Sequence, residues 1–159
     1  MSDKPLDLDF EYPVFDVCID PELQNTKLAC CDIGPDVFGD YVDITHYAME
    51  TIMAAKRGGA SINGSVHVTQ YFEQRAPIKL GERITLKGEV TQVEDVPKGS
   101  LVTSRFEAMR AGGEIPLILE RTSLRVDASR ATAGASTKKP LQAEAPRLTE
   151  LSRLPLQPE

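Results

Sequence analysis

Four carboxylates and one imidazole gather in residues 36–50 of the 159-residue chain: Asp36, Asp40, Asp43, Glu50 and His46. A carboxylate can attack a carbonyl carbon or activate a water molecule, and an imidazole can exchange a proton near neutral pH. Because both kinds of group stand so close in sequence, this segment predicts a nucleophilic or acid–base site.

A helix is predicted directly at this site. From Tyr41 to Lys56, apolar residues recur every three or four positions, which indicates one buried helical face. Asp43 or Thr45 is a plausible N-cap, and the Gly58-Gly59 pair supplies a stop. Unpaired backbone amides near 43–45 would then stabilise negative charge on a reacting carbonyl oxygen.

Strands are predicted on both sides of this helix. The N-terminal ones cover 11–19 and 26–31, followed by a loop at 33–36. After Gly64, four further segments are separated by turn-forming residues: 65–73, 82–94, 100–110 and 114–127. Apolar alternation, as in Val66 and Val68, predicts an antiparallel sheet joined by hairpins with one buried face per strand.

The length predicts a single domain over 1–127, followed by a tail over 128–159 that is rich in Ala, Ser and Pro. Most of the tail is predicted to be disordered, with a short amphipathic piece at 148–154 as an alternative docking segment. The net charge is −6, and no basic stripe with interleaved aromatics occurs, so nucleic acid is not an expected partner.

The chain shows no sign of a membrane span, a signal peptide or a metal site. No apolar run is long enough to cross a bilayer and the N-terminus lacks a signal-like stretch, so a cytoplasmic protein is expected. Cys18, Cys30 and Cys31 are expected to be reduced, partly buried thiols. With only His46 and His67 as further soft ligands, no metal is expected.

A helix followed by an antiparallel meander resembles the hotdog fold. The run from Ser65 to Ile84 looks like the strand, loop and strand of hotdog thioesterases and hydratases. Asp36-Val37-Phe38-Gly39 is similar to the start of the Asp-x-x-Gly-His-x-Asn-Asn motif of the 4-hydroxybenzoyl-CoA thioesterase type, although Asp40 replaces its His. The resemblance implies an α+β hotdog fold over about residues 10–127, with one central helix wrapped by a curved antiparallel sheet.

Thioester hydrolysis is the leading function that the resemblance implies, on an acyl-CoA or an acyl-carrier protein. Asp36 would be the nucleophile or base, with Glu50 as the alternative carboxylate, and Gly39 would contact the substrate. Coenzyme A enters only as part of the substrate, and no other cofactor is expected. The phosphates of coenzyme A would contact cations near the helix end and the strand loop: Lys56, Arg57, Arg75 and Lys79.

Two alternatives stay open. Gly39-Asp40 and His46 loosely resemble the Gly-Asp-x-x-x-x-His signature of R-specific enoyl-CoA hydratases, with one residue more between them, which implies hydration or dehydration by an Asp and His pair. A hotdog protein without catalysis could instead bind an acyl ligand or a partner subunit. On that reading the aspartates cap the helix and order its loop, and His46 lies at an interface or in solvent.

Quaternary structure is also implied by the resemblance. Hotdog domains usually complete their sites by pairing two sheets edge to edge, so a homodimer or a higher homo-oligomer is expected. The active sites would then lie between subunits, with the acidic loop of one facing the helix of the other.

Overall fold

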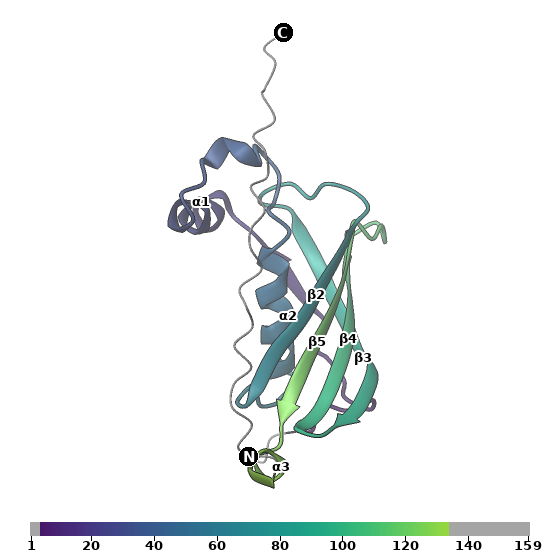
Figure 1. The fold of residues 1–159 in the computed structure, drawn as a ribbon. Coiled ribbons are helices and arrows are strands. Elements are labelled where there is room, and N and C mark those ends of the chain that lie inside the picture. Colours follow the sequence, from purple (N-terminus) through teal and green to yellow (C-terminus); the bar gives the residue numbers. More distant parts are fainter. Residues whose placement is uncertain (1–3, 134–159) are drawn as a thin grey trace, which may run out of the picture.

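A computed structural model describes residues 4–133 of the chain. Five strands and three α-helices, with one short 3₁₀ helix, make up the fold (Figure 1). In chain order they are β1 (Phe15–Cys18), α1 (Pro21–Cys30), η1 (Pro35–Val37), α2 (His46–Arg57), β2 (Ser65–Gln74), β3 (Arg83–Val96), β4 (Gly99–Met109), β5 (Leu117–Val126) and α3 (Ala128–Ala133).

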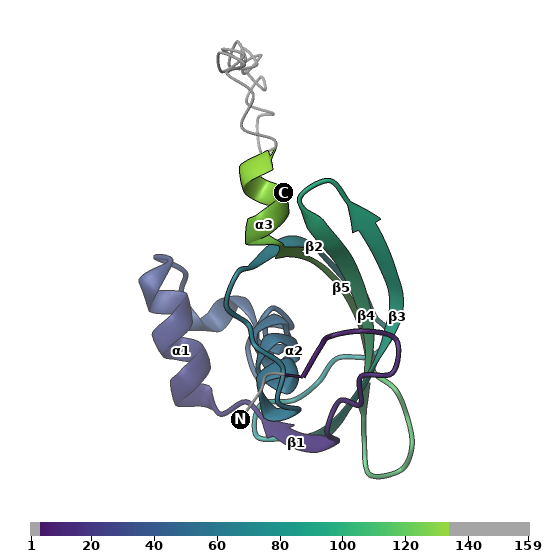
Figure 2. The ribbon, with the colours of Figure 1, turned by 90° about the horizontal axis from the view of Figure 1, so that it is seen from below.

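All five strands form one antiparallel sheet in the order β1-β3-β4-β5-β2. The sheet curves around α2, and α1 lies on the far side of that helix (Figure 2). The predicted arrangement of one helix wrapped by an antiparallel sheet is therefore confirmed. The prediction that hairpins join every strand is wrong for β2, because β2 pairs with β5 and not with its neighbour in sequence, β3.

The core lies between α2 and the concave face of the sheet. Tyr47 and Ala54 of α2 are fully buried against strand residues such as Leu86 and Phe106. Gly88 of β3 leaves room for the Phe106 ring, because a Cβ atom at Gly88 would overlap that ring. Every second residue is buried at Ile84 and Leu86 of β3 and from Val102 to Ala108 of β4, so the alternation predicted for these two strands is confirmed.

The alternation predicted for β2 is wrong, because this edge strand has no fully buried residue. Val66 and Val68 are 51% and 49% exposed, and Tyr71 is also exposed. A bulge between His67 and Thr69 also shifts the register of β2 against β5.

The segment predicted as a strand at 26–31 belongs instead to helix α1. Asp20 caps that helix by accepting a hydrogen bond from the Leu23 amide at 2.8 Å, and Pro21 occupies its first turn. Only Gln24 and Leu28 of α1 are buried, so the sequence carries no apolar stripe that would have indicated a helix.

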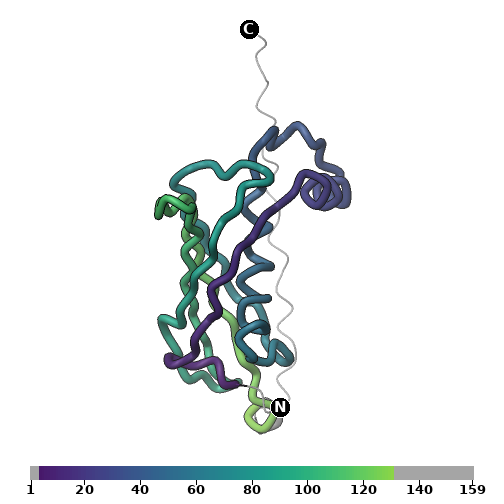
Figure 3. The backbone as a smooth tube through the Cα atoms, turned by 180° about the vertical axis from the view of Figure 1, so that it is seen from behind, coloured from purple at the N-terminus to yellow at the C-terminus, as the bar shows by residue number. Residues whose placement is uncertain are grey.

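Helix α2 begins at His46, five residues later than predicted, because the preceding segment pairs with the loop before β3. The Val42 amide donates to the Ile78 carbonyl at 2.8 Å, and Tyr41 forms an isolated bridge with Lys79. Seen from behind, the N-terminal segment runs along the molecule to α1, beside the end where α2 begins (Figure 3).

Other expectations concern the cysteines, the tail and membrane spans. The three cysteines are unpaired, as predicted, but all are exposed and not partly buried. The tail begins with the helix α3, and the rest of it, including 148–154, lies outside the described residues. Within residues 4–133, no helix is long and apolar enough to cross a membrane.

Candidate functional site

Gln24 of α1 fixes the backbone that leads into α2. Its side chain is 1% exposed. The oxygen Oε1 accepts a hydrogen bond from the Asp43 amide at 2.7 Å, and Nε2 donates to the Tyr41 carbonyl at 3.0 Å. One buried side chain therefore satisfies two backbone groups and ties the start of α2 to α1.

Asp43 is the most constrained carboxylate of the predicted site. It accepts hydrogen bonds from Lys27 Nζ at 2.8 Å, from the Thr45 amide at 3.0 Å and from Thr45 Oγ1 at 2.8 Å, and Lys27 also contacts that hydroxyl. Burial opposes ionisation, but the hydrogen bonds from Lys27 and Thr45 outweigh it and lower the pKa of Asp43. The carboxylate is thus ionised and its oxygens are already hydrogen-bonded. Asp43 therefore suits a structural role at the start of α2 better than the role of a nucleophile.

The same contacts change the predicted oxyanion site. The amide of Asp43 donates to Gln24 and the amide of Thr45 donates to the Asp43 carboxylate. The expectation that the amides of 43–45 are unpaired is therefore wrong for two of the three. The start of α2 is stabilised by the protein's own side chains.

His46, the first residue of α2, carries a nitrogen without a partner. Its Nε2 is buried and has no hydrogen bond within residues 4–133. Burial lowers the pKa of His46, repulsion from Lys27 lowers it further, and Asp43 opposes both. The imidazole is consequently neutral at neutral pH and can accept a proton.

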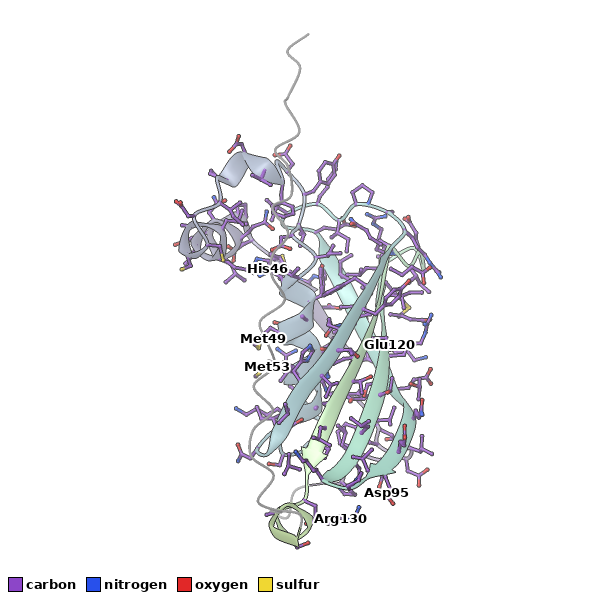
Figure 4. The ribbon with its side chains drawn as sticks, in the orientation of Figure 1. His46, Met49, Met53, Asp95, Glu120 and Arg130 are labelled. Carbon is purple, nitrogen blue, oxygen red and sulfur yellow. The ribbon has the colours of Figure 1, made fainter. Side chains whose placement is uncertain are left out.

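His46 lies close to α1, and Met49 and Met53 follow it along the side of α2 opposite the strands (Figure 4). Met49 is 59% exposed. The next residue after His46 is Tyr47, whose buried hydroxyl also has no partner among the described residues and whose pKa is raised, chiefly by burial. The beginning of α2 therefore combines a neutral imidazole with a largely apolar helix side.

The other predicted residues form separate groups. Gly39, Asp40 and Lys79 line one open cavity of about 460 Å³, together with Pro21, Pro35 and neighbouring residues. Asp36 is exposed in η1 and does not line that cavity.

The predicted residues further along the chain are engaged in contacts of their own. Glu50 forms an ion pair with Arg57 at 3.4 Å, and the Arg57 guanidinium also lies 4.0 Å from the centroid of the Phe15 ring. Arg75 pairs with Glu73 at 2.7 Å. Arg57 and Arg75 are therefore each paired with a neighbouring carboxylate.

Sequence reasoning missed the α1 residues Gln24 and Lys27, because the segment was taken for a strand. It also missed Arg121 and Ser123, which are buried on β5 with polar atoms that have no partner among residues 4–133. A signal for Arg121 exists in the sequence, since it stands two residues after Leu119 on the inward side of an apolar strand.

Among the described residues, no group of His, Cys, Asp and Glu could hold a metal ion.

Several solved structures share this fold. The truncated HadBC complex, a 3R-hydroxyacyl-ACP dehydratase from Mycobacterium tuberculosis, matches with a TM-score of 0.61 and 14% identity over 73% of this chain and 97% of that one. HtdX from the same organism matches with a TM-score of 0.62 and 17% identity over 81% of this chain and 53% of that one. The (R)-hydratase of A. caviae matches with a TM-score of 0.52 and 14% identity over 76% of this chain and 98% of that one.

No protein-family model and no curated protein matches the chain. The chain spans about half the length of HtdX but nearly all of the HadBC chain. At these identities the likeness concerns the fold alone, and it does not specifically support the 4-hydroxybenzoyl-CoA thioesterase type. The curved antiparallel sheet around α2 and these structural matches together show that the chain has the hotdog fold.

Proposed function

We propose that this protein acts on an acyl thioester by reversible hydration of a conjugated double bond, with His46 as the general base. The observation that carries the proposal is the buried, unpartnered Nε2 of His46 at the start of the central helix. Burial and Lys27 lower the pKa of His46, which favours the neutral imidazole. Hydration requires this neutral form, because it can accept a proton from water. The matched hydratase and dehydratase folds agree with this choice.

In the hydration direction, Nε2 of His46 removes a proton from water while the water oxygen bonds to the β-carbon of the enoyl group. The electron pair of the double bond moves toward the thioester carbonyl. The proton held on Nε2 of His46 then passes to the α-carbon, which returns the imidazole to its neutral form. Asp43 is not assigned to proton transfer, because Lys27 and Thr45 already bind its oxygens. Asp40 is not assigned to it either, because it lines a separate cavity.

A homodimer is part of this proposal. Strand β2 lies at an edge of the sheet and exposes the apolar side chains of Val66, Val68 and Tyr71. An edge with free backbone groups and apolar side chains favours pairing with another chain. Pairing through β2 would cover these residues and place a second copy close to α2.

Thioester hydrolysis is the second candidate, and the cavity that contains Asp40 favours it. An exposed carboxylate in an open cavity of about 460 Å³, which Lys79 also lines, can activate water next to an anionic substrate. In that case His46 would be dispensable and the proton would pass to Asp40 or Asp36.

One assay on the purified protein separates these reactions. A panel of saturated and trans-2-enoyl-CoA substrates is incubated with the protein, and loss of enoyl absorbance and release of free thiol are followed in parallel. Hydration predicts loss of absorbance without thiol release, and His46→Gln should reduce the rate by about 10²-fold or more. Hydrolysis predicts thiol release that survives His46→Gln and falls in Asp36→Asn or Asp40→Asn.

Asp32→Asn is the matched control for the loop variants, because Asp32 is exposed in the same region and its positive φ of 57° suits asparagine. Thermal unfolding of each variant verifies that the fold is intact. Substrate-dependent stabilisation without turnover would contradict both reactions and select a non-catalytic acyl-binding protein.

A further inference from the structure

Arg121 is a buried cation without a counter-ion. It lies on the concave face of β5, its residue is 5% exposed, and its Nε is buried without a hydrogen-bond partner. The guanidinium donates a hydrogen bond to the Tyr12 hydroxyl, but within residues 4–133 no carboxylate forms an ion pair with it. Burying a guanidinium with only a neutral phenol as its partner costs folding free energy, and a bound anion would offset that cost.

Polar side chains from two paired strands surround this arginine. The register of β2 against β5 places Ser65 opposite Arg125 and His67 opposite Ser123, so these residues share the concave face with Arg121. Ser123 is 4% exposed, and its hydroxyl has no partner among the described residues. Two cations and one free hydroxyl donor thus lie on one small area of the sheet, although Arg125 also donates to the Ser61 carbonyl.

These residues line a cavity of about 210 Å³ beneath the second half of α2. The opposite side of the cavity is aliphatic and consists of Leu6, Ile52, Ala55 and Ile62. For comparison, a cavity of about 150 Å³ holds a benzene molecule. The space therefore suits a ligand with a charged end and a short apolar end.

We propose that this cavity binds a short aliphatic carboxylate, with its carboxylate group on Arg121 and Ser123 and its alkyl chain against Ile52 and Ala55. A carboxylate matches the planar guanidinium with two parallel hydrogen bonds. Phosphate fits less well, because its polar oxygens would face the aliphatic side without donors.

This site is separate from the one at His46. Ile52 lies six residues after His46 in α2, which corresponds to about 9 Å along the helix axis. His46 does not line the cavity. Carboxylate binding therefore does not depend on the proposed hydration reaction, and each can fail without the other.

Isothermal titration calorimetry on the full chain tests the proposal with defined probes. Butyrate and hexanoate are compared with butyramide and hexanamide, and with inorganic phosphate at matched ionic strength. Saturable binding of at least one acid, with the corresponding amide and phosphate at least tenfold weaker, is expected. No binding of either acid, equal binding of the amides, or tighter binding of phosphate would overturn the proposal.

Variants locate the binding site. Arg121→Met should weaken acid binding at least tenfold, and Ser123→Ala should weaken it several-fold. Arg105→Met is the matched control, since Arg105 lies on the neighbouring strand β4, outside the residues that line the cavity. Unchanged acid binding in Arg121→Met refutes the assignment, and if that variant does not fold, unchanged binding in Ser123→Ala refutes it.

Discussion

The ion pair between Lys27 of α1 and Asp43, just before α2, gives the sharpest prediction, namely the effect of Lys27→Met. Lys27 Nζ lies 2.8 Å from Asp43 Oδ2, and the two side chains are 36% and 10% exposed. Breaking a fully buried pair costs about 3–5 kcal/mol, whereas an exposed pair contributes about 0–1 kcal/mol. Because Lys27 is partly solvated and Thr45 still binds the carboxylate, the expected loss of unfolding free energy near neutral pH is about 1–2 kcal/mol.

The pH dependence of this loss follows from the pKa of Asp43. Its pKa lies below the ordinary value of 3.8 in the folded protein, so its stabilisation is present above that value and is lost as the pH falls through the lower folded pKa. Without Lys27 the folded pKa moves back upward. The difference between the wild type and the variant should therefore be largest near neutral pH and shrink under acidic conditions.

Urea unfolding of both proteins across the acid range measures this difference. Lys87→Met is the control, because Lys87 is exposed on β3 and forms no ion pair among the described residues. A loss below about 0.5 kcal/mol near neutral pH, which is typical of surface changes, would refute the claim that the Lys27–Asp43 ion pair stabilises the fold. A loss that stays constant into acid would refute the role given to the Asp43 charge.

Three further predictions concern packing, the loop and the edge strand. Gly88→Ala should destabilise by about 1–3 kcal/mol because its Cβ overlaps the Phe106 ring, whereas Gly112→Ala, with open space around it, should be nearly neutral in the same thermal unfolding assay. Gln24→Leu should cost about 2–4 kcal/mol in urea unfolding, since it leaves two backbone groups without partners, and a cost typical of a surface site would contradict this. Val68→Lys should shift the protein toward monomer in sedimentation analysis, and an unchanged mass would argue against pairing through β2.

Sequence periodicity predicted the parts of the fold whose burial is one-sided. The helix around Tyr47 and the strands that contain Leu86 and Phe106 repeat their apolar residues at the period of the element. All three elements were found, although α2 begins five residues later than predicted. Helix α1 was missed because only Gln24 and Leu28 are buried. Its capping residue and the proline after it are local signals for a helix, and they would have outweighed the short apolar run.

The candidate site was less predictable because its chemistry depends on contacts between distant segments. The sequence identified Asp43 and His46 as site residues but not Lys27, which occupies the first and lowers the pKa of the second. Which carboxylate remains available therefore follows from the position of α1, and α1 was the element that the sequence misassigned.

The same reasoning yields a last prediction, on the pH dependence of activity. Lys27 repels a protonated imidazole, and Lys27→Met should therefore raise the pKa of His46. If His46 is the base, the acidic limb of the hydration rate should move to higher pH in this variant, because the neutral imidazole is lost earlier as the pH falls. NMR titration of the His46 ring measures the pKa directly. A shifted ring pKa with an unshifted acidic limb would mean that another group, and not His46, removes the proton.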